Sequence, residues 1–445
     1  MRTRTVRTAL ASVAALSLVV AACGGDDDDS AEPAAEPADT TAAESADTTM
    51  AESTDTTMAE STDTTMAEST EESSMEESSM EESSMEESSA EEPAMAPMEC
   101  DAPDEVSLQL QWFVQAQFGG YYAAIDQGFY DDMCLDVNIV EGGVDIVPQT
   151  QLANGAVDFA LAWVPKALAS REAGANIVDI AQIYQRSGTL QVSFVDQGIT
   201  SPADFAGKKI GNWGYGNEYE IFAALGQAGL DPNDDVTLVG QNFDMIGLLE
   251  GEIDAAEAMT YNEYAQVLEA VNPDTGELYT PEDFNVVSYE DVGVGMLQDA
   301  IWADADKLAN DEAYRDIATR FVAASMQGWA YCRDNVQSCA DIVLAAGPTL
   351  GASHQLWQMN EVNKLIWPSP DGIGYIDQGA WDRTVEISLN TPNLEGSTVL
   401  TAEPTDGAFT NDIVEAAWAL LDGMGLDLIG ESYAPIEVTL NEGGA

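Results

Sequence analysis

Basic residues are scarce in this chain. Fourteen lysines and arginines stand against 80 aspartates and glutamates, which gives a formal net charge of −66 at pH 7. A surface this acidic repels phosphate backbones, so the composition argues against any nucleic-acid partner. The acidity indicates solubility in a salty medium more than it indicates a specific cationic partner.

Histidine is scarcer still. The chain has one histidine, His354, which rules out a three-histidine zinc site and gives little basis for a catalytic triad. We expect His354 to be an ordinary surface or helix residue. Pairs of acidic residues are too abundant here to signal general acid–base chemistry. We therefore expect a protein that is not an enzyme and that has no cofactor and no metal site.

Cysteine is limited to five residues, and no Cys-x-x-Cys motif occurs, so a zinc or thioredoxin-type site has little support. Cys23 follows an N-terminal apolar run and is treated apart from the others. The remaining four cysteines allow three pairings. We favour Cys100 with Cys134, because both precede neighbouring predicted strands. The other pair is then Cys332 with Cys339, which closes a short loop.

The N-terminal residues 1–22 are predicted to be a signal peptide. Three arginines within the first seven residues precede an apolar run from Ala9 to Val20. A transmembrane anchor is the alternative, but this run is shorter than the ~20 residues that cross a bilayer. The ending Val-Ala-Ala-Cys23 resembles a lipobox, which implies lipidation of Cys23 and an extracytoplasmic protein anchored to a membrane.

Residues 23–99 are predicted to be an acidic, disordered linker. From Gly24 to Glu99 there is no lysine, arginine or aromatic residue, and short units such as Glu-Glu-Ser-Ser-Met repeat. Repeats this short do not form a structural unit with an apolar face that could be buried. A charged segment without large apolar groups also cannot offset the conformational entropy lost on ordering. The linker would hold the folded part at a distance from the membrane.

Beyond the linker, strand-like runs alternate with amphipathic segments, which predicts an α/β fold of parallel sheets with helices on both faces. Helices are expected over Phe118–Gln127, over Asp145–Ala153 and within Asp304–Met326. The predicted strands are Val106–Gln111, Leu135–Val140, Val157–Ala162, Ile177–Tyr184, Lys209–Asn212, Val236–Val239, Asp254–Ala258 and Val286–Ser288. We assign 100–194 and 297–445 to lobe I and 195–296 to lobe II, with two crossovers between the lobes.

Three indoles are expected to meet at one cleft. Trp112, Trp163 and Trp213 each follow a predicted strand, and ligands of open α/β sheets bind beyond the carboxyl ends of strands. A flat aromatic ligand could stack on these rings, although each indole could instead cap the core. Glu218 could accept hydrogen bonds from an amino-heterocycle, or it could only compensate a helix dipole. The same alternatives hold for Glu263.

Three motifs carry a resemblance to a known family. They are Gln-Ala-Gln-Phe-Gly-Gly-Tyr-Tyr at 115–122, Gly-Asn-Trp-Gly-Tyr-Gly-Asn-Glu-Tyr at 211–219 and Met-Thr-Tyr-Asn-Glu-Tyr at 259–264. Together they resemble the thiamine-pyrimidine synthase-like family of solute-binding proteins, which includes binders of riboflavin and aliphatic sulfonates. Family members that synthesise the pyrimidine consume a histidine and carry a Cys-Cys-Cys-Phe-Cys segment, which this chain lacks.

The resemblance implies a two-lobed, type II periplasmic-binding-protein fold that serves an ABC permease and ATPase, here as a monomer. The expected ligand is a small heteroaromatic nutrient such as a thiamine pyrimidine precursor, with riboflavin or a sulfonate as alternatives. A synthase-type enzyme or a surface adhesion module is less expected. The expected binding residues are Trp112, Gln115, Tyr121, Tyr122, Trp163, Trp213, Asn217, Glu218, Tyr219, Tyr261, Asn262 and Glu263.

Overall fold

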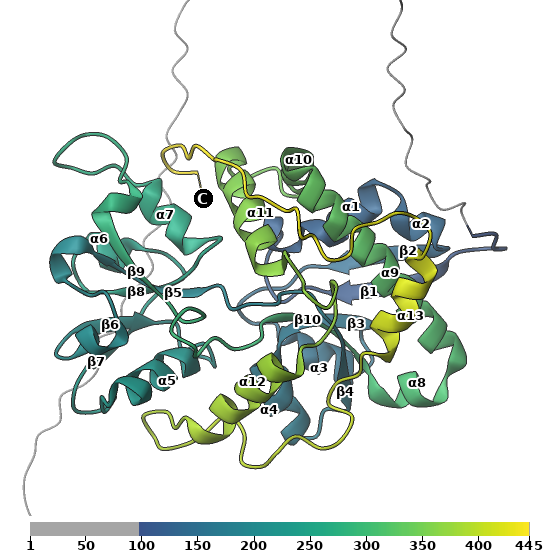
Figure 1. Ribbon diagram of the computed structural model, residues 1–445, viewed down its shortest axis with the longest axis horizontal. Helices are drawn as coiled ribbons and strands as arrows, with labels where there is room; N and C mark the ends of the chain where they lie inside the picture. Colours follow the sequence, from purple (N-terminus) through teal and green to yellow (C-terminus); the bar gives the residue numbers. More distant parts are fainter. Residues whose placement is uncertain (1–97, 445) are drawn as a thin grey trace, which may run out of the picture. The chain divides into compact units, whose positions relative to one another are not determined.

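The computed structural model describes residues 98–444, which lie within one compact unit. The predicted signal peptide, Cys23 and the linker up to residue 97 lie outside the described residues. Two lobes make up the described part, with β1–β4 and β10 in one lobe and β5–β9 in the other (Figure 1). This is the two-lobed α/β architecture that the strand and helix pattern predicted.

Lobe I contains a five-stranded sheet in the order β2-β1-β3-β10-β4. Its strands are β1 (Asp104–Gln109), β2 (Leu135–Val140), β3 (Phe159–Trp163), β4 (Ile177–Gln182) and β10 (Asp299–Asp304). β1 runs parallel to β2 and β3, but β10 is antiparallel to both β3 and β4. Parallel sheets were predicted, but this sheet is mixed. β10 starts beside Trp163, at the cleft end of the sheet, because the chain re-enters lobe I there from lobe II.

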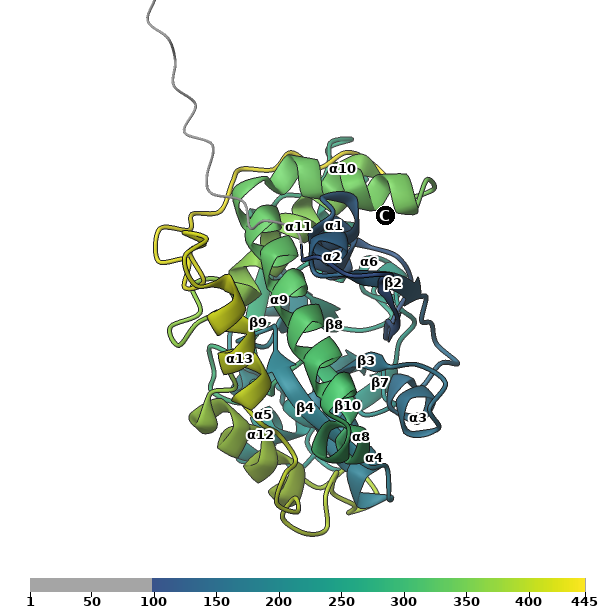
Figure 2. The same cartoon turned by 90° about the vertical axis from the view of Figure 1, so that its right-hand side faces the viewer.

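Helices cover both faces of this sheet, as predicted (Figure 2). Side chains of β3 alternate between the faces: Phe159 and Leu161 pack on one side, and Ala160 and Ala162 on the other. The first face is covered by α1 (Gly119–Asp126), α2 (Phe129–Asp132), α8 (Ala305–Asn310), α9 (Glu312–Asp334), α10 (Val336–Ala346), α11 (Ala352–Ile366) and α13 (Asp412–Leu421). The second is covered by α3 (Pro148–Ala153), α4 (Val164–Glu172) and α12 (Gln378–Asn390).

Lobe II is built on two smaller sheets, β8-β5-β9 and β6-β7. Its elements are β5 (Thr189–Phe194), β6 (Lys209–Asn212), α5 (Tyr219–Ala228), β7 (Thr237–Gly240), α6 (Ile246–Leu249), β8 (Ala256–Met259), α7 (Glu263–Leu268) and β9 (Phe284–Ser288). β5 is antiparallel to both of its neighbours, whereas β6 and β7 are parallel. Single 3₁₀ turns cover Ala116–Phe118, Val195–Gln197, Pro202–Phe205 and Pro281–Asp283.

The first lobe boundary differs from the predicted one at 194. Strand β5 lies before residue 195, yet it pairs with β8 and β9 of lobe II. The first crossover therefore lies between β4 and β5, and the second lies between β9 and β10, close to the predicted residue 297. The boundary was misplaced because the sequence pattern did not reveal β5, whose partners lie more than 60 residues further along the chain.

The cysteines lie in the pairs favoured from their spacing. Cys100 and Cys134 have Cα atoms 6.3 Å apart, and Cys332 and Cys339 have Cα atoms 5.1 Å apart, with the sulfur atoms of each pair at disulfide distance. The first pair ties the start of the described chain to the beginning of β2. Within residues 98–444, no helix is both long and apolar enough to cross a membrane.

Candidate functional site

A cavity of about 660 Å³ lies between the two lobes, where the strands of lobe I end. Both lobes contribute to its wall: Trp112 and Trp163 come from lobe I, and Trp213 comes from lobe II. The structure thus brings together the three indoles that the sequence placed at strand ends. Nine of the predicted binding residues line this cavity: Trp112, Gln115, Trp163, Trp213, Asn217, Tyr219, Tyr261, Asn262 and Glu263.

Phe243 completes the aromatic wall, and sequence reasoning missed it. Its ring centroid lies 4.9 Å from that of Trp112, across the cleft, and 6.0 Å from that of Trp213, with which it stacks. Phe243 follows β7 by three residues. Its place just after a strand end is the signal that could have found it.

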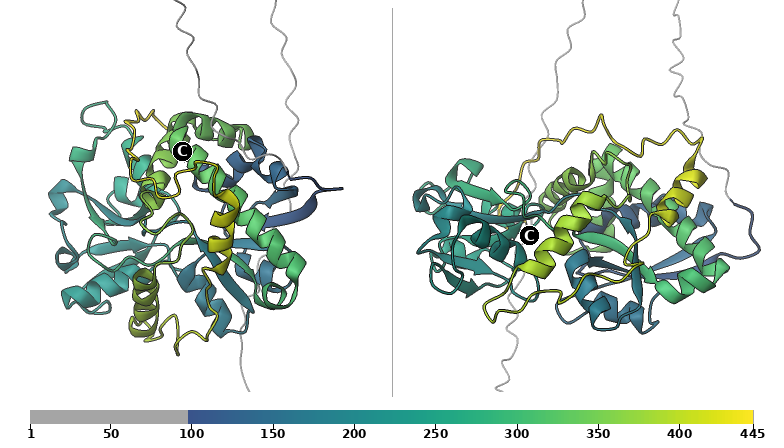
Figure 3. Two further views of the ribbon diagram at one scale, coloured as in Figure 1. Left: turned by 45° about the vertical axis from the view of Figure 1, so that its right-hand side comes forward. Right: turned by 60° about the horizontal axis from the view of Figure 1, so that its bottom comes forward.

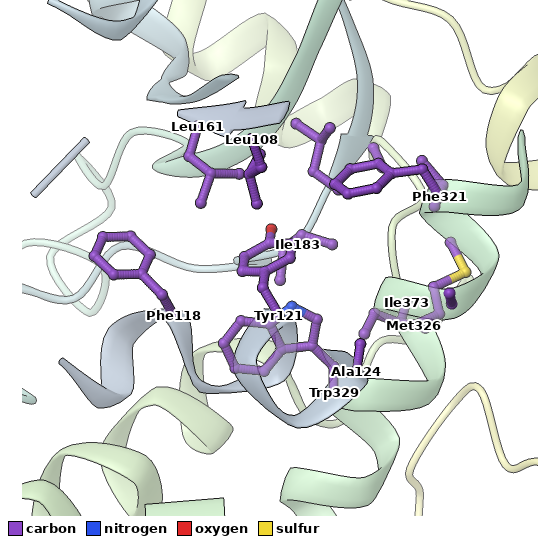
Figure 4. Packing of buried hydrophobic residues seen from close by; sticks show 14 of the residues in the cluster. Leu108, Phe118, Tyr121, Ala124, Leu161, Ile183, Phe321, Met326, Trp329 and Ile373 are labelled. Carbon is purple, nitrogen blue, oxygen red and sulfur yellow. The ribbon is translucent and has the colours of Figure 1, made fainter. Parts of the chain in front are cut away.

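Tyr121 and Tyr122 do not line the cavity. Tyr121 is buried in the core of lobe I, edge-on to Trp329 at 5.6 Å between ring centroids and close to Leu108 (Figure 4). Tyr122 is half-buried on α1, and burial raises its pKa to about 12. Both tyrosines lie in the first turn of α1, which begins at Gly119, and their side chains pack away from the cleft.

Glu218 is also absent from the cavity wall. Its Oε2 accepts a hydrogen bond of 2.9 Å from the backbone N–H of Gly216. The turn before it is tight, since Gly214, Tyr215 and Gly216 have φ angles of +68°, +54° and +86°. The carboxylate therefore stabilises the turn by accepting the Gly216 N–H.

Two acidic residues line the cavity: Asp145 is exposed, and Glu263 is buried. Glu263 lies in the first turn of α7, and its burial raises its pKa. Its Oε2 accepts from the Met259 N–H at 2.9 Å, and its Oε1 accepts from Asn262 Nδ2 at 2.8 Å. A carboxylate has about four acceptor positions, so these two bonds leave capacity for a donor on a ligand.

Lys166 contributes a positive charge that sequence reasoning missed. It is the basic residue among those that line the cavity, and its Nζ lies 4.9 Å from the centroid of the Trp163 ring. The ammonium group donates a 2.7 Å hydrogen bond to Asn217 Oδ1, and burial lowers its pKa to about 8. A lysine three residues beyond a strand-end tryptophan, in a chain so poor in lysine, was the available signal.

Trp163 is held in place by a buried acid. Asp299, the first residue of β10, accepts hydrogen bonds of 2.9 Å from Trp163 Nε1 and from Gln117 Nε2. Gln117 in turn accepts from Gln115 Nε2 at 2.6 Å. Burial raises the pKa of Asp299 to about 6. The sequence did not predict these hydrogen bonds of Asp299, because strand β10 was not predicted.

Trp213 carries a buried indole N–H. Its backbone N–H donates to Glu257 Oε2 at 2.7 Å, but its Nε1 is buried and has no hydrogen-bond partner among residues 98–444. A buried N–H without a partner is costly. Nor do those residues contain a group of three or more histidine, cysteine or acidic side chains that could hold a metal.

Two α/β lobes around a shared cavity define the class of periplasmic solute-binding proteins. A protein of Methylobacillus flagellatus, titled a putative sulfonate ABC transporter, periplasmic sulfonate-binding protein, has the same fold, with a TM-score of 0.54, 14% identity, and coverage of 77% of this chain and 100% of the other. The chain belongs to the NMT1/THI5-like family, whose model matches residues 115–338.

Two relatives of known name resemble this chain over long stretches. The formylaminopyrimidine-binding protein of Halalkalibacterium halodurans is 24% identical over 250 residues, 55% of this chain and 71% of the relative. The riboflavin-binding protein RibY of Chloroflexus aurantiacus is 25% identical over 350 residues, 72% of this chain and 91% of the relative. The family predicted from the three motifs is thereby confirmed.

Proposed function

We propose that this protein is the extracytoplasmic, lipid-anchored solute-binding component of an ABC importer. It captures a small heteroaromatic nutrient, of the kind represented by a thiamine pyrimidine precursor, and the lobes close around the ligand. The observation that carries this proposal is the cavity shared by the lobes, whose wall combines aromatic rings with the buried carboxylate of Glu263.

The cavity suits a flat ligand with hydrogen-bonding edges. Its volume of about 660 Å³ is within the range of small-molecule sites. Rings of Trp112 and Trp213 offer stacking surfaces, with about 0.5–1.5 kcal/mol per ring beyond area burial. Glu263 would accept from an amino group of such a ligand.

The relatives support binding over catalysis. Two of them are named as binding proteins, one for formylaminopyrimidine and one for riboflavin. The Cys-Cys-Cys-Phe-Cys segment of the synthase-type enzymes does not occur in this sequence. Closure of lobe II onto lobe I would bury the ligand, and a permease would recognise the closed form.

An organic anion such as an alkanesulfonate is the second candidate ligand, and Lys166 favours it. The ammonium group lies in the cavity wall and is largely protonated at neutral pH, since its pKa is about 8. A sulfonate would accept from Lys166 Nζ, which donates to Asn217 in this structure. Such a ligand would be repelled by Glu263, so the two candidates differ in how they respond to this carboxylate.

Glu263→Gln separates the two candidates. For a formylated aminopyrimidine or riboflavin, the variant should bind roughly 10- to 150-fold more weakly, because a charge-assisted hydrogen bond of ~1.5–3 kcal/mol is lost. For an alkanesulfonate, removal of the negative charge should leave affinity unchanged or increase it. Calorimetry with each compound on the purified protein measures both.

The matched control is Glu250→Gln, which neutralises an exposed glutamate elsewhere in lobe II. It should bind like the wild type. If Glu263→Gln binds the heteroaromatic compounds as tightly as the wild type does, Glu263 is not their acceptor. If none of the compounds binds to the wild-type protein, the proposed ligand class is wrong.

A further inference from the structure

Lys166 and Glu263 place opposite charges in the wall of one cavity, one from each lobe. Lys166 lies on α4 of lobe I, and Glu263 lies on α7 of lobe II. In the described part of the chain, no ion pair joins Lys166 to a carboxylate. The acids that act on the pKa of Lys166 are Glu257, Glu218 and Asp299, and Glu263 is not among them. The two charges of the cavity wall therefore lie apart, and neither neutralises the other.

The ammonium group of Lys166 has free hydrogen-bond donors. It carries three N–H donors and uses one of them on Asn217 Oδ1 at 2.7 Å. The Asn217 oxygen is held in this direction because Asn217 Nδ2 donates to the Gly214 carbonyl oxygen at 2.8 Å. The Nζ atom lies 4.9 Å from the centroid of the Trp163 ring. No other acceptor of residues 98–444 bonds Nζ, so two N–H donors are left for a ligand.

The acids nearest to Lys166 are already hydrogen-bonded to other donors. Glu218 accepts from a backbone N–H of its own turn at 2.9 Å, and Glu257 accepts from the first backbone N–H after β6 at 2.7 Å. The two oxygens of Asp299 accept from side chains of lobe I at 2.9 Å each. Burial also raises the pKa of Glu257 well above its usual value, which weakens this acid as a counter-ion. A ligand can supply the anion that Lys166 does not contact within the protein.

Glu263 has the complementary capacity. Its carboxylate accepts from the Met259 N–H and from Asn262 Nδ2, and about four acceptor positions are available on a carboxylate. The other acid of the cavity wall, Asp145, is exposed and therefore solvated. The cavity thus presents ammonium donors on lobe I and carboxylate acceptors on lobe II.

We propose that the cavity binds a bipolar ligand: a flat amino-heterocycle that also carries an anionic group, either a phosphate or a carboxylate. The amino group donates to Glu263, and the anionic group accepts from Lys166. This inference rests on the proposed function and narrows its ligand class. It combines in one molecule the two features that the candidate ligands carry separately.

Closure of the lobes favours such a ligand. Closure removes water from both charged groups, and a buried charge without a partner is costly. A neutral amino-heterocycle would leave Lys166 without a counter-ion, and a simple organic anion would leave Glu263 without a donor. A bipolar ligand satisfies both groups. The cavity volume of about 660 Å³ is about twice that of the smallest ligand sites, which leaves room for a ring and an anionic substituent.

Calorimetry with three matched compounds on the purified protein tests the ligand class. The compounds are hydroxymethyl-aminopyrimidine, its phosphate monoester and carboxymethyl-aminopyrimidine. At least one of the two anionic compounds should bind roughly 10-fold or more tightly than the neutral compound, because it gains charge-assisted hydrogen bonds from Lys166. If the neutral compound binds and neither anionic compound binds more tightly, the bipolar assignment is wrong and the proposed function stands.

Lys166→Gln tests which residue recognises the anionic group. Glutamine keeps a donor for Asn217 Oδ1 but removes the positive charge, so the preference for the anionic compound should fall roughly 10-fold or more. This preference is a ratio of two affinities in the same protein, so a partial loss of folded protein does not change it. The matched control Lys307→Gln removes an exposed lysine of α8 in lobe I, outside the cavity wall, and should keep the wild-type preference. A wild-type preference in Lys166→Gln would overturn the role of Lys166.

The amino end of the ligand is tested with the phosphate monoester of hydroxymethylpyrimidine, which lacks the amino group. The wild type should bind the aminated ester more tightly, and Glu263→Gln should lose this preference. Equal binding of the two esters by the wild type would identify a simple organic anion as the ligand and overturn the bipolar assignment. If none of the four compounds binds to the wild type, the proposed function fails together with the inference.

Discussion

Buried carboxylates are the unusual residues of this protein. Glu220, Glu257 and Asp299 are all buried, and in each case burial raises the pKa. Glu220 on α5 accepts a 2.6 Å hydrogen bond from the backbone N–H of Met296, which lies in the second crossover. Its pKa is raised to about 7, so it ionises close to neutral pH inside the protein.

Glu220→Gln should change how stability depends on pH. The folded-state pKa of about 7 lies above the ordinary value of 4.5, so the folded state binds the proton more tightly than the unfolded state. Ionisation therefore lowers the free energy of unfolding of the wild type as the pH rises from about 4.5 to 7. The variant has no carboxyl group to ionise at this position. Its free energy of unfolding relative to that of the wild type should therefore rise across that window, by on the order of 3 kcal/mol.

Urea unfolding at several pH values measures this difference. The exposed Glu250→Gln should show no comparable change with pH. A difference between Glu220→Gln and the wild type that is the same at pH 4.5 and pH 8 would contradict the assignment of a raised pKa to Glu220.

At the scale of elements, helix α1 approaches α9 closely because both helices have a glycine at the contact. A methyl group on Gly120 would overlap the buried ring of Trp329, and one on Gly328 would overlap the carbonyl oxygen of Gly120. Neither obstacle can move easily, since both are in the packed core. With α1 packed closely against α9, Tyr121 faces the core and not the cavity (Figure 4).

Gly120→Ala should destabilise the protein, by about 1–3 kcal/mol, because the added methyl group forces the helices apart. Gly226→Ala is the matched control: it lies within α5, where a methyl group would meet open space. That variant should gain about 0.5–1 kcal/mol from the higher helix propensity of alanine. Urea unfolding of both variants checks the opposite signs, and equal stability of Gly120→Ala and wild type would contradict the close packing.

At the scale of the whole described unit, the C-terminal segment adds a third passage between the lobes. After α13 it runs across α11, where Asn360 Oδ1 accepts from Ile436 N–H at 2.9 Å, and it reaches Glu269 beside α7 (Figure 3). Two crossovers were predicted, and this segment adds a contact that the sequence did not reveal. The hydrogen bonds of Ile436 and Gly443 therefore link the C-terminal segment to both lobes.

Cys23→Ala tests the expected membrane anchor. If Cys23 is the lipidated N-terminus, the variant should lose fatty-acid labelling in cells, while the thermal unfolding of the purified protein should match that of the unlipidated wild-type sequence. Metabolic labelling and a melting curve measure the two effects. Label that persists on the variant would remove the lipoprotein assignment.

The sequence by itself determined the family, the two-lobed α/β class and the meeting of three indoles at one cleft. These follow from local patterns, because alternating strands and helices specify the class, and strand ends lie at one edge of a sheet. Trp112, Trp163 and Trp213 line the cavity for that reason.

Only the tertiary structure decided which polar groups face the cavity. Asp299 and β10 return from distant sequence, and their pairing with β3 is not encoded locally. The tight turn directs Glu218 back to Gly216, whereas Glu263 at the start of α7 remains at the cavity. His354 lies on helix α11, in line with the expectation of a surface or helix residue, but only the tertiary structure shows that it is buried, with Asn262 and Glu269 approaching it from the other lobe. Side-chain direction and contacts between lobes depend on the packing of the folded chain.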